Sequence, residues 1–340
     1  MGLFSSFVEN KPMLFRTEIH PKKSSFEISH ADKIFSIGSC FADCMGNRFQ
    51  DAQFHIYSNP FGVLYNPLSI FGNLEHALRK EAIKTDQIVE SRASYFHYQF
   101  HSEINAHSVS SLLEQVHAIN QSVSESLANA NFLFITLGTA FVYYLKQTSV
   151  SVANCHRQPA DVFDKRMLSV DEIVKAFNQF YEQLKIQNPN IKIVITVSPV
   201  RHIKDTLELN VVSKAILLLS CHEIVKQNAH NVSYFPAYEM MMDDLRDYRF
   251  YKEDMIHPTV QAESYIWEKF AECYFSEETL KINKEIAEIQ TALSHRPFNI
   301  ETEEYVRFIK KTEAKILKLC DKIPSTRLLE KLALKLSREC

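Results

Sequence analysis

Two nucleophilic side chains stand directly after a glycine at the end of a predicted buried strand. Residues 33–37 are mostly apolar and are followed by Gly38, Ser39 and Cys40. A strand that runs into a sharp turn can present a nucleophile at the carboxyl edge of an α/β sheet. The backbone N–H groups of such a turn can also stabilise an oxyanion. The chemistry indicated is acyl transfer, with either Ser39 or Cys40 as the nucleophile.

A carboxylate and a histidine three residues apart follow the last predicted strand. Asp254 and His257 lie just before Pro258 and an amphipathic helical segment. On one turn of chain, Asp254 can accept a hydrogen bond from Nδ1 of His257, which leaves the other ring nitrogen as a general base. A surface loop before a helix-start proline would contain the same residues. Their position after the last predicted strand, in a chain whose first predicted strand ends in a Ser-Cys turn, favours the catalytic interpretation.

Further polar groups follow the other predicted strands. Gly62 can bring a backbone N–H close to a substrate, and the side chains of Asn66 and Thr139 can donate hydrogen bonds. All three are also ordinary turn residues.

Two adjacent pairs, Cys155–His156 and Arg201–His202, are candidates to line a substrate cleft. Arg201 could bind a carboxylate or a phosphate. Structural roles remain open for all four, and a metal site at the first pair would need ligands that the sequence does not identify.

The elements that must position these residues alternate between short apolar runs and helical patterns. Strands are predicted at 33–37, 54–57, 132–137, 191–197 and 232–235, and helices at 67–79, 109–130, 170–187, 207–227 and 260–275. This alternation predicts a three-layer α/β/α sandwich with a mostly parallel five-stranded sheet. We expect an α/β domain over 1–275 and a helical extension over 276–340, with helices at 302–321 and 325–338. The extension could pack on the domain, mediate self-association or bind a partner.

Residues 95–101 alternate aromatic and polar side chains, which predicts an extra strand or hairpin with His97 and His101 on one face. The two histidines could be a metal pair or part of a solvated face.

The composition restricts the class of protein. Lys and Arg number 38 and Asp and Glu 41, so the chain lacks the basic excess of an electrostatic nucleic-acid binder. No apolar run is long enough for a membrane span. The seven cysteines form no CxxC pair, and the N-terminus does not resemble a signal peptide, so we expect reduced thiols in the cytoplasm. No cofactor and no resident metal are indicated.

Taken together, the motifs resemble those of the GSCFA family, over about residues 30–275. The matching segments are 38–42, 59–62, 136–140, 154–156, 198–202, 234–236, 245–250, Asp254 and 257–258. The family is similar to the SGNH (GDSL-like) hydrolases, which have a flavodoxin-like sheet and act on acyl esters, often of acetylated carbohydrates. The resemblance places Cys40 in the position of the nucleophilic serine, Ser39 in that of the preceding aspartate and Gly62 near an oxyanion glycine. It also places Ala140 where an oxyanion asparagine is expected.

The resemblance implies an acyl-ester hydrolase or acyltransferase. In this hypothesis Cys40 (or Ser39) attacks the acyl carbonyl, His257 moves the proton and Asp254 orients His257. The backbone N–H groups of Cys40 and Gly62 would hold the oxyanion, helped by Asn66 or Thr139. Two alternatives remain: an inactive scaffold that binds a glycan or a protein, and a metal-dependent hydrolase.

Overall fold

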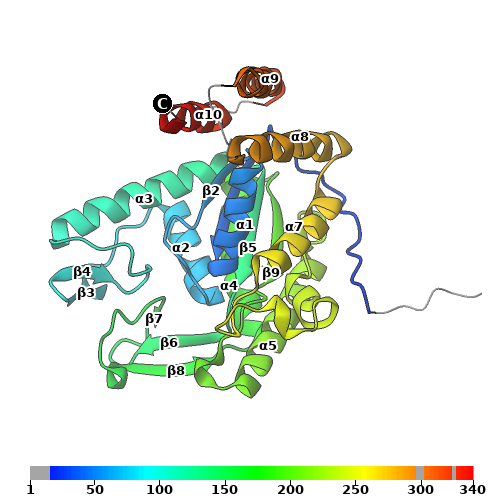
Figure 1. The fold of residues 1–340 in the computed structure, drawn as a ribbon. Coiled ribbons are helices and arrows are strands. Elements are labelled where there is room, and N and C mark those ends of the chain that lie inside the picture. The colour runs from blue at the N-terminus through cyan, green and yellow to red at the C-terminus, as the bar shows by residue number, and fades with distance from the viewer. Residues whose placement is uncertain (1–15, 296–301, 324–326, 340) are drawn as a thin grey trace, which may run out of the picture.

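The protein is built around a five-stranded parallel sheet (Figure 1). The computed structural model describes residues 16–295, 302–323 and 327–339, so the N-terminal segment used to predict a cytoplasmic location lies outside it. The strands of this sheet are β1 (Lys33–Gly38), β2 (His55–Ser58), β5 (Phe132–Leu137), β9 (Lys192–Val197) and β10 (Val232–Tyr234). The helices around it are α1 (Cys40–Asp51), α2 (Pro67–Arg79), α3 (Val109–Asn129), α4 (Val170–Gln187), α5 (Leu207–Gln227) and α7 (Val260–Tyr274).

Each of these helices begins where a short polar side chain accepts a backbone N–H of its first turn. This satisfies a donor that has no partner inside the helix. The capping residues are Ser39, Asn66, Ser108, Ser169, Thr206 and Thr259.

The strand order is β10-β9-β5-β1-β2, and all four pairings are parallel. The chain first steps from β1 outward to β2 and then crosses back to β5 on the other side of β1. The strand order therefore reverses between β1 and β5, and in open α/β sheets ligands bind at the carboxyl ends of the strands at such a point. The structure confirms the predicted sandwich and puts Gly38 and Gly138 at this point.

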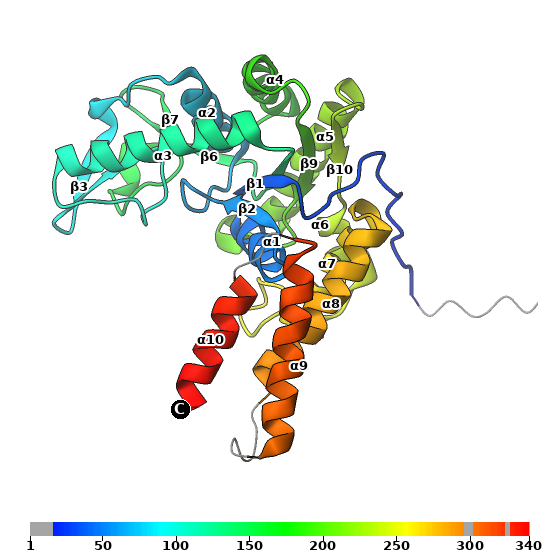
Figure 2. The same cartoon turned by 90° about the horizontal axis from the view of Figure 1, so that it is seen from above.

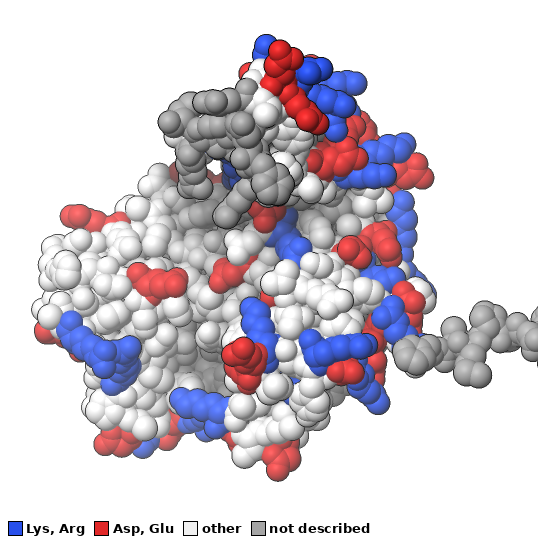
Figure 3. Space-filling model, in the orientation of Figure 1, with Lys and Arg blue, Asp and Glu red and all other residues white. Residues whose placement is uncertain are grey.

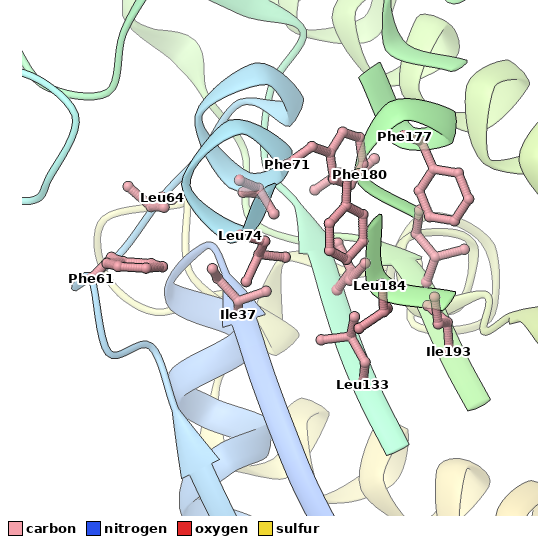
Figure 4. Packing of buried hydrophobic residues seen from close by; sticks show 14 of the residues in the cluster. Ile37, Phe61, Leu64, Phe71, Leu74, Leu133, Phe177, Phe180, Leu184 and Ile193 are labelled. Atoms are coloured by element: carbon pink, nitrogen blue, oxygen red, sulfur yellow. The ribbon is translucent and has the colours of Figure 1, made fainter. Parts of the chain in front are cut away.

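The two faces of the sheet are covered by different helices (Figure 2). Alternate residues of a strand point to opposite faces, and both faces are covered, so β5 is buried throughout and β1 and β9 are buried after their first residues, Lys33 and Lys192. One face packs against α2, α3, α4 and α5, and Figure 4 shows Phe71 of α2 and Phe180 of α4 above Leu133 of β5. The other face packs against α1 and α7, where Phe49 and Phe270 meet Phe134. Burying one such side chain contributes about 1.5–3 kcal/mol.

Two small antiparallel sheets lie beside the main sheet. The first pairs β3 (Ile88–Ser91) with β4 (Ser94–His97), which agrees with the predicted hairpin. Because β4 ends at His97, His101 does not share its strand face. His97 is buried, with its Nε2 bonded to the Lys84 carbonyl at 3.1 Å. The second sheet, β6 (Phe141–Leu145), β7 (Ser151–Val152) and β8 (Phe163–Met167), was not predicted.

The remaining helices form the C-terminal extension: α8 (Glu277–Ser294), α9 (Glu303–Cys320) and α10 (Arg327–Glu339). They bury their own apolar cluster, separate from those of the main sheet. Ion pairs Lys315–Glu288 and Lys322–Glu285 join α9 and the residues after it to α8. The predicted boundary at 275/276 stays a prediction. Short helical turns occupy Thr85–Gln87, Ala160–Val162, Ile203–Asp205, Ala237–Glu239 (α6), Met240–Asp244 and Tyr248–Phe250.

Charged side chains are mixed in sign over the face shown in Figure 3. Within the described ranges, none of the helices combines the length and the apolar character needed to span a bilayer.

Candidate active site

The turn after β1 is held in a conformation that only glycine adopts readily. Gly38 has a φ of 143°, and a Cβ at this position would lie 2.1 Å from the carbonyl oxygen of Thr136. The Gly38 N–H donates to Oδ1 of Asn59 at 2.8 Å, and the Asn59 amide donates to Asp43 at 2.6 Å. Asn59 therefore connects the turn to the first helix, which explains one of the matching motifs.

Ser39 and Cys40 have different positions at the start of α1. Ser39 is the N-cap: its side chain is fully buried and its Oγ accepts the Phe41 N–H at 3.4 Å. Cys40 is the first residue of the helix and is partly exposed. The geometry gives Ser39 a capping role and leaves Cys40 the more accessible of the two nucleophiles.

The Cys40 thiol is not activated by its surroundings alone. Burial raises its pKa, and the nearby Asp43 carboxylate adds to this effect. The Lys214 ammonium and the N–H groups of Cys40 and Phe41 lower the pKa, but they offset the rise only in part. At neutral pH Cys40 is therefore a thiol, and a base must remove its proton before it can attack.

Asp254 and His257 form the hydrogen bond that their spacing predicts. Asp254 Oδ2 accepts from His257 Nδ1 at 2.7 Å, and Oδ1 accepts the N–H groups of Ile256 and His257, each at 2.9 Å. These three bonds lower the pKa of Asp254 to about 2, so it is ionised. With Nδ1 as donor, Nε2 of the neutral ring can accept a proton, and the ring is 40% exposed.

Arg201 supports the loop that carries this pair. Its backbone N–H donates to the Ile256 carbonyl at 3.3 Å, and its guanidinium donates to the Met255 carbonyl at 3.4 Å. The guanidinium also lies over the ring of Tyr251, 4.0 Å from its centroid. In this position Arg201 joins the segment after β9 to the Asp254–His257 loop.

Lys214, a residue of α5, is buried and was not predicted as a site residue. Its Nζ donates to the carbonyls of Gly138 at 2.7 Å and Ser198 at 2.8 Å, which follow β5 and β9. Burial lowers the pKa of Lys214 to about 7. A lysine in a helix pattern normally indicates a solvated face, so nothing in the sequence marks it as buried.

His202 lies between the turn and a neighbouring cavity. A Cβ at Gly138 would lie 3.2 Å from His202 Nε2 and 3.3 Å from the Ser39 Cβ. Burial, with the charges of Lys214 and His257, lowers the pKa of His202 to about 3, so its ring is neutral. Its Nε2 is buried and has no hydrogen-bond partner in the described part of the chain.

Most of the predicted oxyanion donors are already engaged. The Gly62 N–H donates to the Asn59 carbonyl at 2.8 Å, and the Asn66 side chain bonds to Ser69 as the cap of α2. The Thr139 N–H donates to the Tyr65 carbonyl at 3.0 Å, and its hydroxyl bonds to Ser213 at 3.0 Å. At the start of α1, the Phe41 N–H is bonded to the Ser39 Oγ at 3.4 Å, and the Cys40 N–H lies beside the Cys40 sulfur.

The cavity beside His202 has a volume of about 500 Å³. Its walls include Asn66, Thr139 and Cys155 of the predicted set, so the fold brings these together with His202. His156 lies behind the wall: it is buried, its Nε2 donates to the His97 carbonyl at 2.9 Å and its Nδ1 accepts from the Ser102 hydroxyl at 3.1 Å. Burial lowers the pKa of His156, which agrees with a neutral ring.

No metal centre accompanies this site in the described residues. Across 16–295, 302–323 and 327–339, no group of three or more His, Cys, Asp and Glu side chains is arranged to hold a metal ion.

The fold and the site define a doubly wound α/β protein with Cys40 at the switch point of its sheet and a hydrogen-bonded Asp254–His257 pair in the loop before α7. The chain belongs to the GSCFA family: the family model matches residues 33–270, and the model of the GSCFA domain protein, C-terminal domain, matches residues 286–337. The resemblance stated from the motifs is therefore confirmed.

The fold also resembles a solved structure, that of an acetyl xylan esterase (Est2A) from the rumen bacterium Butyrivibrio proteoclasticus. The two share 13% identity with a TM-score of 0.36, over 72% of this chain and 63% of the esterase chain. The match thus spans less than two thirds of the esterase, and a likeness this weak carries no functional argument. No curated protein matches the sequence.

Proposed function

We propose that the protein is an acyl-ester hydrolase or acyltransferase that acts on an acylated carbohydrate or a small ester through Cys40, His257 and Asp254. The observation that carries the proposal is the 2.7 Å bond between His257 and Asp254, in the loop before α7. On the same side of the sheet, β1 delivers Cys40 to the first turn of α1, which packs near α7. A base oriented by a carboxylate is what a protonated thiol needs.

In the proposed reaction Cys40 Sγ attacks the acyl carbonyl and its proton passes to His257 Nε2. The tetrahedral intermediate then expels the alkoxide, which takes the proton back from His257, and an acyl thioester on Cys40 remains. Water, or a sugar hydroxyl, gives its proton to His257, attacks the thioester and releases the acid or the new ester. The cysteine leaves as a thiolate and recovers the proton from His257, so the cycle closes without a cofactor.

We assign the oxyanion to the N-terminal end of α1. The Cys40 N–H has no acceptor in an earlier helical turn, the Phe41 N–H makes only a long 3.4 Å bond to the Ser39 Oγ, and the helix dipole favours negative charge there. This arrangement differs from the superfamily pattern because the Ala140 side chain has no donor, and because the Ala140 N–H and the Asn66 and Thr139 side chains are engaged elsewhere.

The test is the formation of an acyl-enzyme. Incubation with p-nitrophenyl acetate, followed by mass spectrometry of the intact protein, should show an acetyl adduct. The adduct should be lost in Cys40→Ala and kept in Ser39→Ala. Cys44→Ala is the matched control, because Cys44 lies one turn further along α1 and burial raises the pKa of its thiol to about 12. An adduct that is lost in Ser39→Ala but kept in Cys40→Ala would contradict the mechanism.

The second candidate function is a binding module for a glycan or a protein. It is favoured by the raised pKa of the Cys40 thiol and by the engagement of Gly62, Asn66 and Thr139. Absence of an adduct and of esterase activity from pH 5 to 9, with saturable binding of an acylated saccharide, would support this candidate and reject the first.

A further inference from the structure

The cavity beside His202 carries a charge opposite to that of the whole chain. The protein has a net charge of −3. The cavity is lined by three cationic side chains, Arg157, Lys165 and Lys204, and by one carboxylate, that of Asp205. A positive cavity in an acidic protein focuses its field on an anionic ligand.

The four charges are not equivalent. Lys165 is bonded to Asp205 and lies over the ring of Phe141, with its Nζ 4.5 Å from the centroid, so its charge is compensated. Arg157 and Lys204 are exposed, and neither pairs with a carboxylate anywhere in the described ranges. These two cations are the ones available to a ligand.

The loop that carries Arg157 is held in a strained conformation. His156 and Arg157 have φ values of 46° and 61°, the left-handed region that residues other than glycine occupy at a cost of about 1–3 kcal/mol each. The buried ring of His156 holds the loop through the bonds to His97 and Ser102 described above, and it stacks on Phe96 at 4.9 Å. A strained loop conformation that is held in place by a buried side chain is typical of a functional loop.

The rest of the wall offers flat apolar surfaces. Tyr65, Phe141, Tyr143 and Phe163 line the same cavity. Aromatic rings beside a few polar groups are a common surface for ligand binding. Their presence next to two uncompensated cations favours a ring-shaped ligand that carries an acidic group.

We propose that Arg157 and Lys204 form a subsite for a carboxylate or phosphate group of the substrate, and that the acyl ester cleaved at Cys40 belongs to an acidic saccharide. The statement that this acidic group belongs to the substrate rests on the proposed function. The statement that Arg157 and Lys204 bind an anionic group does not. Arg157 supplies a planar pair of donors and Lys204 a point charge, both suited to an anionic oxygen.

The experiment compares two sugar esters that differ only in charge, an acetylated methyl glucuronide and an acetylated methyl glucoside. The ratio of their kcat/KM values, acidic over neutral, should fall about tenfold in the double variant Arg157→Gln/Lys204→Gln, since two partly exposed charge contacts together contribute about 1.4 kcal/mol. The control Lys175→Gln removes an exposed charge of α4, outside the cavity, and should keep the wild-type ratio. An unchanged ratio in the double variant would overturn the proposal.

A binding measurement separates failure of the subsite from failure of the catalytic proposal. Calorimetric titration of the Cys40→Ala protein with both sugar esters and with acetyl-coenzyme A reports affinity without turnover. Tighter binding of the glucuronide, lost in the double variant, supports the subsite even if no ester is cleaved. If the double variant loses affinity only for acetyl-coenzyme A, the acidic group is a phosphate and the acidic saccharide is refuted. If each ligand binds with the same affinity with and without the double substitution, the subsite is refuted.

Discussion

Replacing Lys214 with methionine removes a buried ammonium group and keeps a side chain of similar length. Burial lowers the pKa of Lys214 from its ordinary value of 10.5 to about 7. Between these pH values the unfolded chain binds a proton that the folded protein does not, so the free energy of unfolding rises with pH. Over the whole range the rise is about 5 kcal/mol, and from pH 6.5 to 9 it is about 2.5 kcal/mol.

Urea unfolding of the wild type and of Lys214→Met, in reducing buffer at several pH values, measures this contribution. The wild-type free energy of unfolding minus that of the variant should increase by about 2.5 kcal/mol from pH 6.5 to 9, because titrations common to both proteins cancel. Lys175→Met, at an exposed position of α4, should give a difference that does not change with pH. A flat difference for Lys214→Met would refute the reasoning, since Lys214 would then stay protonated throughout.

Three further predictions concern the turn and its supporting loop. Ser39→Ala removes the cap of α1 and should lower the free energy of unfolding, measured in urea, by about 1 kcal/mol. Iodoacetamide should still alkylate Cys40 in this variant. Loss of alkylation would show that the cap also keeps the Cys40 thiol accessible. Gly38→Ala places a Cβ against a backbone carbonyl and should cost more than about 2 kcal/mol of stability by the same measurement; a neutral effect would contradict the left-handed geometry. Arg201→Met should speed hydrogen–deuterium exchange of residues 251–258, measured by mass spectrometry, and unchanged exchange would mean that the arginine does not hold this loop.

The main sheet and its helices follow closely from local patterns. The helices α2, α4 and α5 and the strand β5 have the predicted bounds, because α2 and α4 have helical apolar spacing, α5 is a long segment rich in apolar residues and β5 is a short continuous apolar run. The sheet of β6, β7 and β8 escaped prediction. Its strands are short, and β8 contains charged residues such as Lys165, whose ammonium group lies over the ring of Phe141.

Some contacts of the candidate site could likewise be predicted from the sequence, and others could not. The bond between Asp254 and His257 is local, so their spacing of three was enough to predict it. Lys214 could not be predicted, because its burial depends on two carbonyls that follow strands distant in the chain. The structural role of Arg201 likewise depends on contacts with a loop about fifty residues away, and its contact with an anion stays a prediction.

The sequence by itself determined the family, the α/β sandwich, the Ser-Cys turn and the Asp254–His257 pair, because each is encoded in a short window or in the period of apolar residues. Only the tertiary structure decided that Ser39 caps a helix while Cys40 remains accessible, since burial depends on what packs over the turn. The same is true of the positive cavity. Arg157, Lys165 and Lys204 come from three separate segments, and their charges act together only because the fold places them around one space.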